Sequence, residues 1–375
     1  MKETTTNSRD DFLELHVLGG RQGESCVLRL PGGKWGVVDC YTSTPSRPEA
    51  NPTVALLRHE GVTSLEFVCL THPHGDHFLG MDQLLNEFPP RMFWYPPFFG
   101  EKVRLAQLLK TLHINAIRSN HDSRRCVANE LMALVQTYRT NKSIVRKPAV
   151  IGTQLYPLPL GSLEDVSIFS VAPSGRRMEA YQSELDRCLD DDRIPQKFLK
   201  YSAHNIISIA LQICFGQTRI MLGGDVECHG WKDSLAEFGE NRVSSHLVKA
   251  SHHGSSTGFC DGLWRAFSHG GHLPLAVVTP YFAQRLPSQA GLAHIYSHSR
   301  RVFTTHKSAA LRQSANVPFS MLVPPKSRIK LHEKFGIQEE FRDTGFGHCT
   351  FVFDDKGQCN DIRLLGNAGE IVLNP

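Results

Sequence analysis

The order of apolar and polar residues predicts an alternation of strands and helices in the first part of the chain. Apolar or alternating runs bounded by Gly, Pro and polar residues predict strands. These strands are expected at 12–18, 25–30, 35–40, 65–70 and 93–95. Residues 54–59 and 78–88 instead have the spacing of short helices, and Pro89-Pro90 ends the second one. This part of the chain therefore mixes strands and helices.

The same pattern continues through the second part. Strands are expected at 166–173, 206–215, 218–222, 246–250 and 275–280. Two helical stripes within 103–139 predict helices that face the core, and the charged segment 174–200 predicts a helical insertion whose acidic run 190–192 is solvated. Residues 341–345 and 350–357 are expected to form a closing β-hairpin.

Composition narrows the class of protein. The 375 residues are 41% hydrophobic and 21% charged, which is typical of a globular protein of one large domain or two modest ones. No apolar run approaches the ~18 residues of a membrane-spanning helix, so no membrane contact is expected. The ten Cys form no C-x-x-C pair, which favours a reducing cytoplasm. A net charge of +4 is compatible with an anionic substrate but is too weak to indicate nucleic acid by itself.

The most specific chemical signal follows the strand predicted at 65–70. His72, His74, Asp76 and His77 lie within six positions, and imidazole and carboxylate are ligands that zinc and similar divalent metals prefer. The Pro and the Gly between them exclude a regular helix. These four residues therefore predict a metal-binding loop at the end of a strand.

At this H-x-H-x-D-H loop the chain resembles the metallo-β-lactamase-fold hydrolases, whose loop binds two metals. The resemblance implies an α/β (α+β) fold, a four-layer αββα sandwich with the site at one edge of its two sheets. It also implies a single domain over 1–375, with insertions at about 100–147, 174–203 and 306–340 and a C-terminal β-hairpin at about 341–375. The family includes many kinds of hydrolase.

The second half of the chain supplies matching motifs. Asp225 follows two glycines and resembles the family carboxylate that bridges the two metals, although an Asp in a glycine turn is common in any protein. His252-His253-Gly254-Ser255 resembles the H-H-G-S element of the subgroup that includes the hydrolase domain of ComEC DNA-uptake proteins. His252 is the expected ligand of the second metal and His253 is the alternative. The histidine that does not bind is left as a general acid or a substrate contact, which makes His253 a catalytic candidate.

Two further residues complete the set that the resemblance implies. His204, four residues before Ser208, fits the third ligand of the first metal, whereas the ComEC-like subgroup often has Asn and Ser here, which Asn205 and Ser208 also fit. Asp39, after the third strand, matches a family Asp that lies under the metal loop and orients its ligands by accepting their N–H groups.

The implied mechanism uses two divalent metals, with zinc as first choice and manganese or iron as alternatives. The residues implied for the first metal are His72, His74 and His204, those for the second are Asp76, His77 and His252, and Asp225 bridges. The metals would lower the pKa of a shared water towards 7, and Asp76 would orient that water and accept its proton. The expected activity is that of a metal-dependent hydrolase.

Substrate and partners are less defined by the sequence. The H-H-G-S element favours a phosphodiesterase or nuclease, with a phosphodiester or nucleic acid as substrate. A hydrolase of a small ester, thioester or lactone is the alternative, and a non-catalytic metal-binding module is a third. About twenty residues separate Asp225 from His246, which leaves no room for the domain that the family's RNA-processing nucleases insert there. A partner ATPase of a bacterial conflict system is a family-level expectation.

Overall fold

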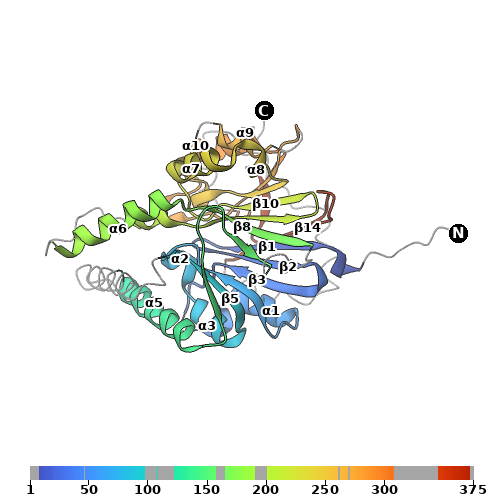
Figure 1. The fold of residues 1–375 in the computed structure, drawn as a ribbon. Helices are drawn as coiled ribbons and strands as arrows, with labels where there is room; N and C mark the ends of the chain where they lie inside the picture. The colour runs from blue at the N-terminus through green and yellow to red at the C-terminus, as the bar shows by residue number, and fades with distance from the viewer. Residues whose placement is uncertain are drawn as a thin grey trace.

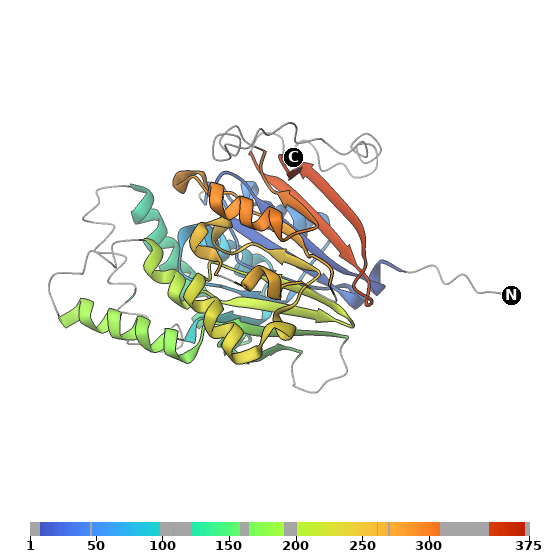
Figure 2. The same cartoon turned by 90° about the horizontal axis from the view of Figure 1, so that it is seen from above.

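The computed structural model describes residues 8–45, 47–97, 108, 122–157, 165–190, 201–260, 262–268, 271–307 and 345–371. Over these residues the strands form two sheets of eight strands each, with helices on the outer face of both (Figure 1). Seen from above, α10 (Gln289–Ser297) and its neighbouring helices lie across the strands of the second sheet (Figure 2). The predicted four-layer α/β sandwich is confirmed.

The first sheet has the strand order β15-β14-β1-β2-β3-β4-β5-β6. Its strands are β1 (Leu13–Gly19), β2 (Glu24–Leu30), β3 (Lys34–Val38), β4 (Leu65–Cys69), β5 (Pro90–Tyr95), β6 (Val145–Pro148), β14 (Gly347–Phe353) and β15 (Cys359–Gly366). Strands β3 to β6 are parallel, and the remaining pairs are antiparallel. Strand β2 therefore begins at the edge where β3 ends.

The second sheet has the strand order β16-β13-β12-β11-β10-β9-β8-β7. Its strands are β7 (Gln154–Tyr156), β8 (Val166–Ala172), β9 (Ala210–Phe215), β10 (Thr218–Leu222), β11 (Leu247–Lys249), β12 (Leu275–Val278), β13 (Arg301–Thr304) and β16 (Gly369–Ile371). Strands β10 to β13 are parallel. The carboxyl ends of β10, β11 and β12 therefore meet at one edge.

The helices form the two outer layers of the sandwich (Figure 1). The α-helices are α1 (Pro52–His59), α2 (Gly75–Phe78), α3 (Met81–Glu87), α5 (Asp122–Thr140), α6 (Gly175–Asp190), α7 (Cys228–Phe238), α8 (Glu240–Val243), α9 (Leu263–Ala266) and α10. The 3-10 turns are η1 (Arg9–Asp11), η2 (Pro31–Gly33), η3 (Pro48–Ala50), η5 (Tyr201–Ile207), η6 (Ser251–Gly254), η7 (Ser256–Gly258) and η8 (Phe282–Gln284). Apolar residues of α1, α3 and α5 pack on the first sheet, and those of α7, α9 and α10 pack on the second.

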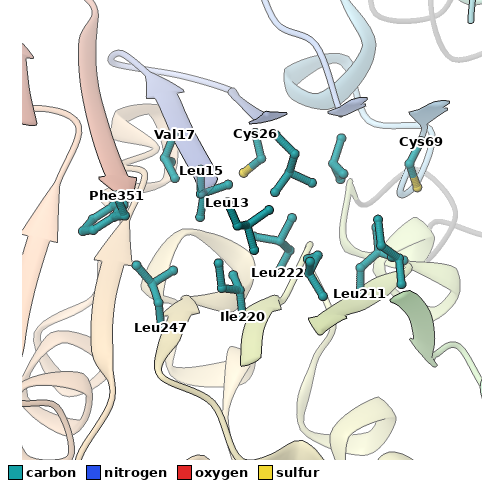
Figure 3. Packing of buried hydrophobic residues seen from close by; sticks show 14 of the residues in the cluster. Leu13, Leu15, Val17, Cys26, Cys69, Leu211, Ile220, Leu222, Leu247 and Phe351 are labelled. Carbon is teal, nitrogen blue, oxygen red and sulfur yellow. The ribbon is translucent and has the colours of Figure 1, made fainter. Parts of the chain in front are cut away.

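The central core lies between the two sheets. Alternate residues of β1 (Leu13, Leu15 and Val17) face Ile220 and other apolar residues of the second sheet (Figure 3). All of these side chains are buried. Because burying one such side chain contributes about 1.5–3 kcal/mol, this alternation fixes which face of each strand points inward.

Most predicted strands are confirmed, but the bounds of some predicted elements are wrong. The helix expected over 78–88 is divided into α2 and α3, and Gly80 between them has a φ of +96°. The strand expected over 206–215 begins only at Ala210. The main-chain N–H of Ile209 donates to the carbonyl of Thr71 at 3.1 Å, so this stretch crosses to the metal loop instead of extending the sheet.

Several other predictions fall partly on residues outside those described. The first helical stripe, at 105–112, lies outside the described residues except for Leu108, and the second stripe lies on α5. The acidic run lies outside them after Asp190, and so does the first strand of the expected hairpin up to residue 344. The strand expected over 350–357 is wrong in its bounds and its partner, because it ends at Phe353 as part of β14, and residues 354–357 form the turn that leads to its hairpin partner β15.

Candidate metal centre

The candidate site lies where the parallel strands of both sheets end. Asp39 follows β3 and His72 follows β4, while Asp225 follows β10 and His253 follows β11. Neighbouring parallel strands deliver their carboxyl ends to the same edge. The sandwich therefore brings residues that are more than 150 positions apart into one site.

Asp39 holds the metal loop from below. Its backbone is left-handed, with a φ of +59°. Its carboxylate accepts hydrogen bonds from the N–H of Thr71 at 2.8 Å, the hydroxyl of Thr71 at 2.7 Å and Nδ1 of His77 at 2.7 Å. Because Nδ1 of His77 donates to this carboxylate, Nε2 is the nitrogen that faces the site and that binds a cation once it has lost its proton. This is the geometry expected of a residue that orients a ligand.

The atoms at the centre of the site have no hydrogen bonds of their own. Nε2 of His77, Oδ1 of Asp76 and Oδ1 of Asp225 are buried and have no hydrogen-bond partner among the described residues. His77 Nε2 lies 3.4 Å from Asp225 Oδ1 and 3.8 Å from Asp76 Oδ2. A buried polar atom without a partner is costly. An imidazole nitrogen and two carboxylates that converge in this way fit a divalent cation.

The histidines predicted for the first metal lie side by side. Nε2 of His72 is 2.8 Å from Nδ1 of His74 and 3.7 Å from Oδ2 of Asp225. The rings of His74 and His204 are 5.2 Å apart, and Nδ1 of His204 is hydrogen-bonded to the hydroxyl of Tyr181 at 2.6 Å. His204 therefore faces the site from η5 through His74. Ser208 also reaches the site, since its hydroxyl accepts the N–H of Asp225 at 2.9 Å.

His252 and His253 both lie in a strained turn, which sends their side chains to different places. Both have a left-handed backbone, with φ of +47° and +52°. The side chain of His253 is 1% exposed and its Nε2 lies 3.1 Å from Asp76 Oδ2. His252 is 12% exposed, and its Nε2 lies 4.0 Å from Asp225 Oδ2 and 3.4 Å from the amide nitrogen of Asn205. His253 thus lies inside the site, and His252 lies at its rim.

The charges of the site shift its pKa values strongly. Burial opposes the charge on His77, but the carboxylates of Asp225, Asp39 and Asp76 raise its pKa well above the usual value. Burial would raise the pKa of Asp76, yet His77 and the neighbouring histidines lower it to about 2. Burial lowers the pKa of His74 to about 4. At neutral pH the site therefore holds ionised carboxylates and a neutral His74, the forms that bind metal.

Among the described residues, three groups have ligand atoms within 4.8 Å of one another. These groups are His72, His77 and Asp225; Asp76, His77 and His253; and Glu24, Asp39 and His77. The ligand atoms of the third group already have partners within the protein: Asp39 is hydrogen-bonded to His77, and Glu24 forms an ion pair with Lys249. The first two groups share His77 and fit metal ions.

Sequence reasoning missed three contributors, namely Glu24, Lys249 and Tyr181. Glu24 and Lys249 form a buried ion pair between the sheets, and Tyr181 of α6 contacts His204. One signal was available for Lys249, because a charged residue within the apolar run 247–250 predicts a buried partner. Tyr181 lies in a polar segment that offers no comparable signal.

Comparison with known proteins supports the resemblance to the metallo-β-lactamase superfamily. The model of the metallo-beta-lactamase superfamily matches residues 18–119, which include the metal loop. This part of the chain therefore resembles the superfamily, and the two-sheet sandwich is consistent with the superfamily's fold. The superfamily consists mostly of metal-dependent hydrolases, and its fold binds metal ions, usually zinc. No curated protein matches the sequence significantly.

Several solved structures resemble the chain distantly. Zn(2+)-bound PqqB from Methylobacterium extorquens is 12% identical, with a TM-score of 0.40, over 79% of this chain and 98% of that one. YhfI from Bacillus subtilis, a metallo-beta-lactamase fold protein, is 13% identical with a TM-score of 0.38, over 79% and 97%. A long form RNase Z from yeast is 13% identical with a TM-score of 0.39, over 77% of this chain and 39% of that one. Similarity at this level carries no argument about activity.

No helix among the described residues is long and apolar enough to cross a membrane.

Proposed function

We propose that the protein is a hydrolase that uses two divalent cations, zinc first with manganese or iron as alternatives, to cleave a phosphodiester bond. The observation that carries the proposal is a set of buried ligand atoms of His77, Asp76 and Asp225 that have no hydrogen-bond partner among the described residues, with Nε2 of His77 3.4 Å from Oδ1 of Asp225. Bound cations would lower the pKa of a water molecule towards neutrality and stabilise the charge that develops on the attacked group.

Asp225 is suited to bridge two cations because its two oxygens face different histidines. Oδ2 lies 3.7 Å from His72, and Oδ1 lies 3.4 Å from His77 and 3.9 Å from His253. His74 and His204 extend the His72 side of the site. The first cation is therefore assigned to His72, His74 and His204, and the second to Asp76, His77 and one histidine of the H-H-G-S turn.

For that last ligand the geometry favours His253 over His252. His253 is the histidine of the turn that joins Asp76 and His77 in a group of metal-binding geometry. His252 lies at the rim, where Nδ1 is 3.1 Å from the hydroxyl of Thr257 and 3.4 Å from Glu227. His252 is thus placed to contact the substrate or its leaving group, and Asp76 to orient the attacking water and accept its proton.

The substrate class rests on resemblance. Residues 252–255 resemble the H-H-G-S element of the ComEC-type subgroup, which includes nuclease-type and phosphorylcholine-esterase-type members, and this favours a phosphodiesterase or nuclease. Hydrolysis of a small ester, thioester or lactone is the second candidate, because the same metal core suits it. A cytoplasmic location and a partner ATPase stay predictions.

A substrate panel tests the proposal. The metal-loaded protein is assayed with bis(p-nitrophenyl) phosphate, single- and double-stranded DNA, RNA, p-nitrophenyl acetate, a thioester and a lactone. We expect phosphodiester cleavage that is lost with chelator and falls about 10²–10⁴-fold in Asp76→Ala.

Asp233→Asn is the control and should keep full activity, because Asp233 is paired with Arg177 on the outer helices. Undiminished activity in both Asp76→Ala and Asp225→Ala would contradict the mechanism, and turnover confined to the carboxylic esters would favour the second candidate.

A further inference from the structure

A buried ion pair joins the two sheets beneath the candidate metal centre. Glu24 begins β2 in the first sheet, and Lys249 ends β11 in the second. Their side chains are 3% and 1% exposed, and Nζ of Lys249 donates a short hydrogen bond to Oε1 of Glu24. Removing two charges from water is expensive, and apolar replacements of such pairs often cost no stability. The pair therefore calls for a role other than stability.

The second carboxylate oxygen of Glu24, Oε2, faces His253. Oε2 accepts a hydrogen bond from the hydroxyl of Thr279 and lies 3.4 Å from Nδ1 of His253. The same Nδ1 lies 2.9 Å from the carbonyl oxygen of Thr279. Because carbonyl and carboxylate oxygens only accept, Nδ1 must carry a proton here. Nε2 lies 3.1 Å from Oδ2 of Asp76, to which it can donate only while it carries a proton, and it is the ring nitrogen left to bind a cation once that proton is displaced.

The arrangement repeats the one beneath His77. Asp39 accepts from Nδ1 of His77 and leaves Nε2 facing the site. For His253 the carbonyl of Thr279 accepts from Nδ1, and Glu24 lies behind it, 3.4 Å from Nδ1 and hydrogen-bonded to the hydroxyl of Thr279. Oε1 of Glu24 also lies 3.8 Å from Nδ1 of His77. Both histidines of the Asp76 group are thus backed by a buried carboxylate that lies on the side opposite to the candidate ligand atom.

We propose that Glu24, held in place by Lys249, is a positioning residue for the cation bound by Asp76, His77 and His253. It fixes the tautomer and the orientation of His253 through Thr279. This inference rests on the proposed function, because it assumes that the site binds two cations. It predicts that loss of the Glu24 charge lowers the affinity for one of the two cations and leaves the affinity for the other unchanged.

Zinc titration of metal-free Glu24→Gln tests the inference. Partners that orient a metal-binding histidine typically change metal affinity about 10–100-fold. We therefore expect one of the two zinc-binding events to weaken by that factor and the other to stay within about twofold of its normal affinity. Glu14→Gln is the matched control, because Glu14 is also buried and ion-paired on the first sheet, with Arg9 and Arg363. It should leave both binding events unchanged.

A second pair of variants tests the inference even if Glu24→Gln has a folding defect. Thr279→Val keeps the side-chain shape but removes the hydroxyl that contacts Glu24, and Thr279→Ser restores it. We expect weakened binding of one zinc in the Val variant and normal binding in the Ser variant. In cobalt-substituted protein, the visible absorption bands of one of the two ions should change in the Val variant only. A general loss of stability would not produce this difference.

The outcomes separate the two proposals. Two zinc ions bound with normal affinity by both Glu24→Gln and Thr279→Val would overturn the role of Glu24 and leave the proposed function intact. An equal loss of affinity for both zinc ions would also overturn the role of Glu24. If the unmodified protein binds no zinc, manganese or iron, the proposed function fails, and the inference fails with it. Where Glu24→Gln does not fold, the comparison of Thr279→Val with Thr279→Ser decides alone.

Discussion

His252 and His253 are neighbours with similar backbone angles, yet their side chains have different surroundings. The strained turn, with φ of +47° and +52°, sends one ring inward and leaves the other at the rim. Left-handed backbone at such residues costs about 1–2 kcal/mol each. The sequence favours the residue nearest the strand end, His252, as the ligand. The geometry favours His253.

Single alanine variants distinguish the two histidines. His253→Ala should lose about one divalent cation per chain, because it removes a member of the Asp76 group. His252→Ala should keep both cations and lower kcat, since its ring only borders the site. Metal content measured by mass spectrometry after dialysis provides the comparison. Loss of a cation in His252→Ala but not in His253→Ala would restore the assignment made from sequence.

A second pair of histidines is buried away from the metal centre. Nδ1 of His16 lies 3.0 Å from Nε2 of His348 and 3.2 Å from the hydroxyl of Thr350. Trp35 stacks on the ring of His16 at 5.9 Å. Burial lowers the pKa of His348 to about 3 and lowers that of His16 well below its usual value. Both rings are therefore neutral in the folded protein at neutral pH.

These depressed pKa values predict acid sensitivity of the fold. An unfolded histidine takes up a proton near pH 6.5, whereas folded His348 resists protonation down to about pH 3. The stabilising contribution is complete above pH 6.5 and is lost as the pH falls towards 3. Each such histidine lowers the free energy of unfolding by about 1.4 kcal/mol per pH unit in that window.

Denaturant unfolding of the metal-free protein between pH 6 and 4 checks this prediction. His348→Gln should show a shallower decline than the unmodified protein, while His272→Gln, an exposed residue, should show the same decline. Parallel curves for the unmodified protein and His348→Gln would contradict it.

At the scale of elements, α6 contributes to the site although its sequence predicts only a polar insertion. It carries Tyr181, whose hydroxyl is hydrogen-bonded to Nδ1 of His204 at 2.6 Å. Tyr181→Phe should lower the free energy of unfolding by about 0.5–1.5 kcal/mol. If His204 binds the first cation, the affinity for that cation falls as well. Tyr296→Phe on α10 is the control, and equal stability of the two variants would contradict a role for the Tyr181 hydroxyl.

Elements set by local patterning were predictable from sequence. Alternating residues such as Leu13, Leu15 and Val17 fix a strand because its inner face must be buried. The stretch before Ala210 was not predictable in this way. It is apolar enough for a strand, but Ile209 and Ser208 bond to the metal loop and to Asp225 instead. A tertiary contact of this kind overrides local propensity.

The candidate site was predictable to a similar extent. His72, His74, Asp76 and His77 form a local motif, so their proximity follows from spacing alone. The positions of Glu24 and Lys249 depend on the packing of one sheet on the other, 225 residues apart in sequence, which no local pattern encodes.

For the whole molecule, the candidate ligands come from both sheets. Asp76 and His77 follow β4 of the first sheet, and Asp225 and His253 follow β10 and β11 of the second. Cations that bind only the folded state should therefore stabilise the sandwich. At a free zinc concentration of 100 times Kd, the gain for one site is about 2.7 kcal/mol.

Thermal unfolding with and without zinc measures this gain. The melting temperature of the metal-free protein should rise on addition of zinc and return to its initial value with chelator. Asp225→Ala should lose most of the rise, because it removes the carboxylate that we propose bridges the two cations. An identical rise in Asp225→Ala would show that zinc stabilises the protein at another place.

The central claim is that the two sheets together hold a pair of divalent cations. Metal analysis of the purified protein, beside Asp225→Ala purified in the same way, tests it most directly. We predict close to two divalent cations per chain in the unmodified protein and fewer than one in the variant. A protein that contains no divalent cation and takes up none on incubation with zinc, manganese or iron would contradict the account.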